Sequence, residues 1–127
     1  MDLQLTQSFS YPKSVLLKAL IDPAFHLAVA KKMDSLEVEL LDHRINGDLH
    51  LVRIRRRVQN QSPVPAALAK FAPSEVNLTH SDEWNLKTFT GHLKVEIDQA
   101  PVRLKCVAVV TSKGKGCDRR FDWEIKS

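Results

Sequence analysis

The chain has 127 residues, of which 43% are hydrophobic and 27% are charged, and its net charge is +4 at neutral pH. This length and composition predict one globular domain over residues 1–127, and no apolar run approaches the roughly 20 residues that a membrane span requires. The net charge alone is too small to indicate nucleic-acid binding. No signal-peptide pattern follows Met1, so we expect a cytoplasmic location and no stable membrane insertion.

The first part of the chain predicts one strand followed by two short helices. Leu3 and Leu5 alternate with polar residues, as in a half-buried strand. Pro12 ends this strand, and the apolar residues after it have helical spacing. Asp22-Pro23 then breaks the helix and begins another, because aspartate caps helix N-termini and proline suits the first helical position.

A β-hairpin is predicted around Asn46-Gly47, a dipeptide typical of tight turns. A two-residue loop would place Glu39 opposite Ile54, whereas a three-residue loop over 46–48 places Leu40 there instead. We prefer the three-residue loop because it matches apolar with apolar residues and acidic with basic ones. Its remaining pairs are Glu37 with Arg57, Val38 with Arg56, and Glu39 with Arg55.

Arginines are concentrated in the second strand of this hairpin. Alternation directs Arg53, Arg55 and Arg57 toward solvent, where the glutamates of the first strand can neutralise two of them. Nucleic-acid binding would also require aromatic side chains among the positive charges, and this face of the hairpin offers none. We therefore predict a solvated charge ladder and no nucleic-acid partner.

Four further strands are predicted between Val76 and Lys126, because apolar and polar residues alternate there. Before them, residues 60–74 contain three prolines, which exclude a strand and predict a connection. Its apolar residues Val64, Leu68 and Phe71 would let it cover an open end of the sheet. The loops of the four-stranded segment are expected at 88–89 and 99–100, with a turn at Ser112–Gly116.

These loops define which residues of the four strands face one another. Trp84 is expected opposite Leu93, Leu93 opposite Cys106, and Cys106 opposite Trp123, so that one apolar face crosses the antiparallel sheet. Cys106 is then a small core residue, and it does not meet Cys117 at the turn.

Alternation along the strand directs Arg56 inward, together with the apolar residues of the same strand. On the next strand, alternation directs His80 and Asp82 inward. A buried guanidinium requires an anion or several acceptors. One interpretation is an Arg56–Asp82 ion pair, or an Arg56 side chain that reaches solvent. The other is an anchor for the carboxylate or phosphate of a ligand.

The opening strand, proline, helix and Asp-Pro break occur in the segment FSYPKSVLLKALIDPAFHLAV, from Phe9 to Val29. This segment resembles the START-like superfamily of lipid-transfer and polyketide-cyclase-related proteins. Pro63-Val64-Pro65 and Glu83-Trp84 are similar to motifs of an uncharacterised bacterial family within it. The resemblance implies a helix-grip fold: an α+β arrangement of about seven curved antiparallel strands with two short helices between the first two.

START-like domains end with a long helix across the concave face of the sheet, and this sequence stops at Ser127 after its last predicted strand. We therefore expect an open apolar face carrying Trp84, Leu93, Trp123 and Ile125. Large apolar patches are unusual on soluble monomers, so a second copy, a partner protein, a bound amphiphile or a terminal helix that this sequence does not include should cover this face.

The resemblance and the apolar face together imply non-catalytic binding of a hydrophobic or amphipathic, lipid-like molecule. The alternatives are an interaction module that self-associates, for example as a dimer, through the uncovered face, and a small cyclase- or hydrolase-like enzyme that uses His80 and Asp82. No residue pattern predicts a metal or another cofactor. The candidate ligand-binding residues are Arg56, His80, Asp82, Trp84, Leu93, Val95, Phe121 and Trp123.

Overall fold

The computed structural model describes residues 2–59, 75–98 and 103–126, so the predicted connection 60–74 and the loop at 99–100 lie outside the described residues. Neither of the two helices in these described ranges is long and apolar enough to cross a membrane. The elements in chain order are β1 (Asp2–Phe9), α1 (Lys13–Leu20), α2 (Pro23–Lys32), β2 (Glu37–Asn46), β3 (Leu49–Gln59), β4 (Glu75–Asn85), β5 (Thr90–Ile97), β6 (Arg103–Lys113) and β7 (Gly116–Lys126).

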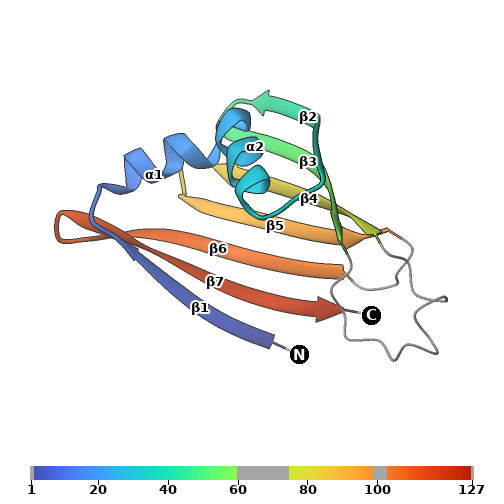
Figure 1. Ribbon diagram of the computed structural model, residues 1–127. Helices are drawn as coiled ribbons and strands as arrows, with labels where there is room; N and C mark the ends of the chain where they lie inside the picture. The colour runs from blue at the N-terminus through green and yellow to red at the C-terminus, as the bar shows by residue number, and fades with distance from the viewer. Residues whose placement is uncertain (1, 60–74, 99–102, 127) are drawn as a thin grey trace.

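The strands form one seven-stranded sheet in the order β1-β7-β6-β5-β4-β3-β2, so the first strand pairs with the last one. Every neighbouring pair is antiparallel. Both helices lie on one face of the curved sheet (Figure 1), which we call the inner face. The predicted fold class, a helix-grip-like α+β sheet with two short helices between strands one and two, is confirmed.

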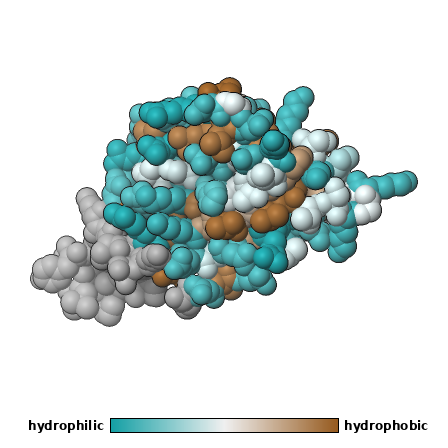
Figure 2. All heavy atoms as spheres, turned by 180° about the vertical axis from the view of Figure 1, so that it is seen from behind, coloured by the Kyte–Doolittle hydropathy of each residue, from teal (hydrophilic) through white to brown (hydrophobic). Residues whose placement is uncertain are grey.

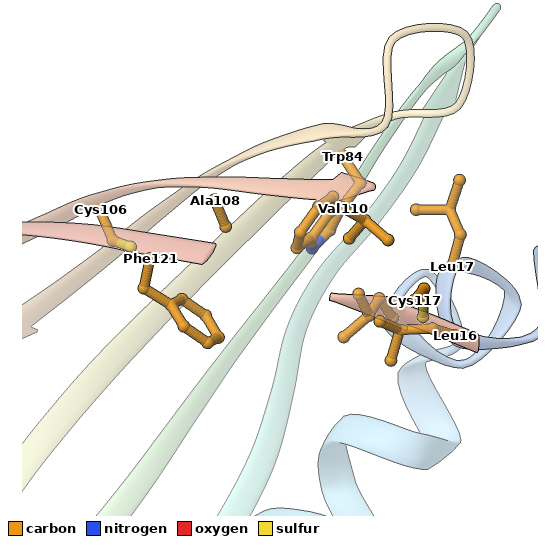
Figure 3. Packing of buried hydrophobic residues seen from close by; sticks show 9 residues of the cluster. Leu16, Leu17, Trp84, Cys106, Ala108, Val110, Cys117 and Phe121 are labelled. Atoms are coloured by element: carbon orange, nitrogen blue, oxygen red, sulfur yellow. The ribbon is translucent and has the colours of Figure 1, made fainter. Parts of the chain in front are cut away.

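Two clusters of buried residues form the core on the inner face. The larger cluster lies under α1, which packs against β6 and β7, and includes Leu16, Leu17 and Trp84. Figure 3 shows the two leucines close to Cys117, and Trp84 beside Val110. The smaller cluster joins Ala30 of α2 to β3, through the buried side chains of Val52 and Ile54.

The second helix begins where the sequence predicts. Asp22 is the N-cap residue, its carboxylate accepts a hydrogen bond from the Ala24 N–H at 2.9 Å, and Pro23 opens the helix. This cap fixes the end of α1 and the start of α2 close together, so that α2 turns onto β2 and β3 while α1 remains on β6 and β7.

The β4–β5 register differs from the expected one by two residues. Trp84 lies opposite Gly91, not Leu93, and Leu93 lies opposite Asp82. The turn is longer than expected because the Asn85 side chain accepts hydrogen bonds from the N–H groups of Lys87 and Thr88, at 2.9 and 3.1 Å. A shift of two residues preserves parity, so every side chain keeps its predicted face. The pairs Leu93–Cys106 and Cys106–Trp123 are as predicted.

The expectation that Trp84 lies on an open face is wrong. Its side chain is completely buried, because α1 covers this end of the inner face. The indole ring also lies against β5 at Gly91, where an added Cβ would approach three ring atoms to 2.6–2.7 Å. Gly91 therefore leaves the space that the indole ring occupies.

The β2–β3 hairpin has the predicted register far from its turn, and near the turn it has neither of the two registers considered from the sequence. From Glu37 to Leu40 the pairing is the predicted one, with Leu40 opposite Ile54. The turn itself has two residues, Gly47 and Asp48, and the register shifts between Leu40 and Asp42. A bulge at Leu41 thus absorbs the extra residue that we had assigned to the loop.

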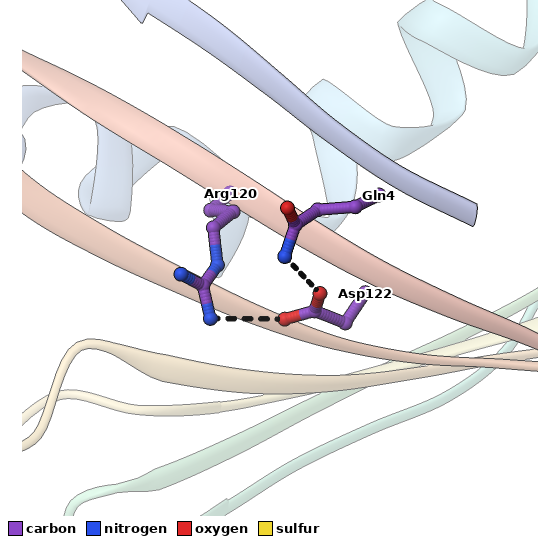
Figure 4. A network of polar contacts seen from close by, with 3 residues as sticks. All are labelled: Gln4, Arg120 and Asp122. Atoms are coloured by element: carbon purple, nitrogen blue, oxygen red, sulfur yellow. Dashed lines mark hydrogen bonds and ion pairs between the residues drawn. The ribbon is translucent and has the colours of Figure 1, made fainter. Parts of the chain in front are cut away.

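The opposite, outer face is largely a ladder of polar pairs. Arg57 pairs with Glu37 at 3.1 Å, and Arg55 pairs with Asp98 at 2.7 Å, not with Glu39. At the β1 edge, Asp122 accepts a hydrogen bond from Gln4 at 2.7 Å and pairs with Arg120 (Figure 4). Seen from behind the view of Figure 1, the surface is mostly hydrophilic, with hydrophobic side chains gathered near its middle (Figure 2).

Substituting Gly91 by alanine is expected to lower the free energy of unfolding by about 1–3 kcal/mol, because the new methyl group would overlap the Trp84 ring. Chemical denaturation followed by tryptophan fluorescence measures this loss. His92→Ala, on the exposed side of the same strand, is the control and should stay within about 0.5 kcal/mol of the unmodified protein. Equal stability of Gly91→Ala and the control would contradict the packing described.

Candidate ligand-binding cavity

A cavity of about 370 Å³ lies on the inner face, between α2 and the sheet. It occupies the gap between the two core clusters, with Leu20 and Phe121 on one side and Ala30 and Ile54 on the other. Phe25 and Val29 of α2, and Met33 directly after it, are partly exposed apolar side chains on the cavity wall. A larger hollow of about 460 Å³ lies on the outer face, where charged side chains such as Arg53, Lys94 and Lys105 line it.

We take the inner cavity as the candidate site, because a helix covers it and its walls combine apolar residues with a few polar groups. Of the predicted residues, the cavity is lined by Arg56, His80, Asp82, Leu93 and Phe121. Trp84 lies outside it, buried under α1. Val95 and Trp123 are half-buried elsewhere on the inner face, with the Trp123 ring stacked on Phe121 at 6.2 Å between centroids.

Arg56 and His80 form the first polar pair of the cavity. The Arg56 Nε–H donates a hydrogen bond to His80 Nε2 at 2.9 Å. An accepting Nε2 must carry a lone pair, so His80 is neutral with its proton on Nδ1. Burial, together with the nearby charges of Arg56 and His26, lowers the pKa of His80 to about 4. His80 is therefore an uncharged acceptor at neutral pH and gives Arg56 no counter-charge.

His26 and Asp82 form the second polar pair, with 3.7 Å between His26 Nδ1 and Asp82 Oδ2. The other ring nitrogen of His26, Nε2, donates to the carbonyl oxygen of Leu20 at the end of α1. Burial raises the pKa of Asp82, and the nearby charges of His26 and Arg119 oppose this shift.

Arg119 is the third polar group, and the sequence analysis did not select it. Its guanidinium carbon lies 4.5 Å from the centre of the Phe121 ring, and its Nη2 donates to the Gln7 side-chain oxygen at 2.6 Å. Its Nε is buried and has no hydrogen-bond partner among the described residues. Burial lowers the pKa of Arg119, while the charge of Asp82 opposes this shift.

Two spacing signals could have identified the missed residues. His26 shares a helical stripe with Val29, Ala30 and Met33, at spacings of three, four and seven, and all four line the cavity. Arg119 has the inward parity of Phe121 and Trp123 on β7, but the apolar pattern of that strand was counted only from Phe121 onward.

The polar groups can bind and orient a molecule more readily than they can move its protons. One ring nitrogen of His26 is bonded to the Leu20 carbonyl, and Nε2 of His80 is occupied by Arg56. Burial raises the pKa of the Cys106 thiol to about 11, so Cys106 is no nucleophile at neutral pH. In the described part of the chain, no three His, Cys, Asp or Glu side chains are grouped as metal ligands.

Comparison with known proteins places the chain in a family and a fold. The family model described as "Protein of unknown function (DUF2505)" matches residues 4–127. None of the curated proteins matches the sequence. Among solved structures, TTHA0849 from Thermus thermophilus is 13% identical with a TM-score of 0.61, over 99% of this chain and 74% of that one.

Two further solved structures share the fold. Ara h 8.0201 is 8% identical with a TM-score of 0.67, over all of this chain and 77% of the other. The di-domain ARO/CYC StfQ from the steffimycin biosynthetic pathway is 10% identical with a TM-score of 0.57, over 96% of this chain and 36% of that one. At these identities the likeness shows the helix-grip fold, and it assigns no activity.

The His80 environment predicts how stability depends on pH. As the pH falls, His80 of the unfolded chain takes up a proton near pH 6.5, whereas His80 of the folded protein stays neutral down to about pH 4. His80 therefore does not lower the free energy of unfolding above pH 6.5, and it lowers this free energy progressively between pH 6.5 and 4. His80→Gln keeps an acceptor for Arg56 without the titration. Denaturation at pH 7 and 4.5 should show the advantage of the unmodified protein over His80→Gln falling by roughly 2 kcal/mol.

Exposed His92 supplies the control for this measurement, because His92→Gln should follow the pH profile of the unmodified protein. The raised pKa of Asp82 increases the free energy of unfolding as the pH falls, which is opposite to the effect of His80. The unmodified protein and His80→Gln both contain Asp82, so this effect cancels when the two are compared. Parallel pH profiles for His80→Gln and the unmodified protein would contradict a buried, neutral His80.

Proposed function

Because this chain belongs to the DUF2505 family of proteins of unknown function, we propose a function from its cavity: it binds a hydrophobic or amphipathic small molecule between α2 and the inner face. The observation that carries the proposal is the cavity itself. Its volume of about 370 Å³ falls within the range of small-molecule sites, roughly 300–1,000 Å³. Its apolar wall and its few grouped polar side chains suit a molecule with an apolar body and one polar end.

The arrangement of α2 supports this proposal. Phe25, Val29 and Met33 are 38%, 40% and 52% exposed, although they lie on the side of α2 that lines the cavity. Apolar side chains in that position gain from contact with an apolar molecule, at about 25 cal/mol for each Å² removed from water. A bound molecule would thus complete the packing between α2 and the sheet.

A second candidate function is self-association. Leu3, Leu5 and Ile125 are 54%, 48% and 40% exposed, and their parity places them on the inner face of β1 and β7, outside the cavity. An apolar group of this kind suits a contact with a second copy of the chain. The two functions are compatible, because they use different parts of the inner face.

Filling the cavity should weaken ligand binding without unfolding the protein. Val29→Trp places a large ring on the cavity wall at a partly exposed position, and it should weaken binding of the neutral dye Nile red at least about tenfold. Val15→Trp is the matched control, since Val15 is an exposed valine of α1 outside the cavity. A fluorescence titration measures both, and equal affinities for the two variants would overturn the proposed site.

Native mass spectrometry of gently purified protein separates the two candidate functions. A monomer with a discrete extra mass that disappears on denaturation is the expected result for a ligand carrier. A ligand-free dimer that Leu5→Lys dissociates, and Val15→Lys does not, would favour self-association through β1. A bare monomer would count against both.

A further inference from the structure

Arg56 is a partly buried cation on the inner face, with apolar residues opposite it on both neighbouring strands. Its neighbours across the sheet are Val38 on β2 and Leu78 on β4, and its side chain lines the cavity. Burial lowers the pKa of Arg56, which reflects the loss of water around its charge. A guanidinium that has lost part of its hydration is stabilised by an anion within hydrogen-bond distance.

The described residues do not supply that anion. The hydrogen bond from Arg56 to His80 ends on a neutral imidazole, and no carboxylate of the described residues lies within 4.0 Å of the Arg56 guanidinium. Asp82, the only acidic residue among the described residues that line the cavity, is paired with His26. The ion pair between Arg56 and Asp82 that the sequence analysis considered is therefore not formed.

Charges around the cavity add up to an excess of positive charge. Two guanidinium groups, Arg56 and Arg119, line it together with one carboxylate, Asp82, which has His26 beside it. Arg119 donates to an uncharged amide and lies over an aromatic ring, so it too has no carboxylate in ion-pair contact among the described residues. An uncharged ligand would leave this excess uncompensated, and a cationic ligand would increase it.

We propose that the cavity selects an amphiphile with an anionic head, a carboxylate or a phosphate, which Arg56 binds while the wall formed by α2 holds the apolar tail. This inference rests on the proposed function and adds the charge of the ligand to it. The guanidinium keeps its Nη groups for a paired contact with two oxygens of the head, because the described residues use only its Nε.

Four probes with matched chemistry test the proposal. Decanoate carries an anionic head, decanol a neutral head and decyltrimethylammonium a cationic head on the same tail, and acetate has the head without the tail. Displacement of Nile red at pH 7 and low salt measures their affinities. Decanoate should bind at least about tenfold more tightly than decanol, and acetate and the cation should bind much more weakly.

Variants assign the preference to a residue. Arg56→Gln should reduce decanoate affinity about tenfold and decanol affinity much less, so that the preference for the anion is lost, while Arg56→Lys should retain part of the preference. Arg55→Gln, the neighbour on the outer face, is the control and should bind as the unmodified protein does.

The outcomes separate this inference from the proposed function. Equal affinity for decanoate and decanol, or tighter binding of the cation, would overturn anion selection and leave the ligand-binding proposal intact. If acetate binds as tightly as decanoate, the site binds simple anions, and the proposal that the ligand has an apolar tail is overturned. A preference that survives in Arg56→Gln would overturn the role of Arg56. Failure of Nile red and every probe to bind would overturn both proposals.

Discussion

The alternation of side chains along paired antiparallel strands is the constraint on which the candidate site depends. Each strand presents every second residue to the inner face, and six antiparallel pairings align these residues across the sheet. A slip of one residue would expose Trp84 to water and carry Arg56 and Asp82 out of the cavity. The energy of burying Trp84 therefore also holds the polar residues in place.

The position of the helices explains why a cavity exists. Asp22 and Pro23 turn the chain between α1 and α2, so that the helices pack on different strands and each completes its own cluster of buried residues. The clusters are separated by the part of the sheet that carries His80 and Asp82. Polar groups are tolerated there because neighbouring side chains satisfy them, as Arg56 does for His80.

Alternation in the sequence predicted the strands and directed Arg56, His80 and Asp82 to the same face, and the resemblance of Phe9–Val29 supplied the helix-grip arrangement. The register between β3 and β4, which brings the three residues to one cavity, could not be predicted because a long connection separates these strands. Alternation also could not show which inner-face residues the helices cover, because that depends on packing between distant elements. Trp84 is buried by α1 for this reason. The hydrogen-bond partners were equally inaccessible: His26 reaches Asp82 only because α2 crosses the sheet at that point, and helix placement is not encoded in strand alternation.

The pairing of β1 with β7 also determines the order in which the sheet can assemble. Gln4 is bonded to Asp122, which lies 118 positions later in the chain, whereas the other strands pair with their neighbours in sequence. Closing so long a loop is entropically costly and slows folding. During synthesis, β1 has no strand to pair with until β7 has been made. Until then its backbone edge is unpaired and its apolar side chains are not packed on the sheet, which are conditions that favour aggregation.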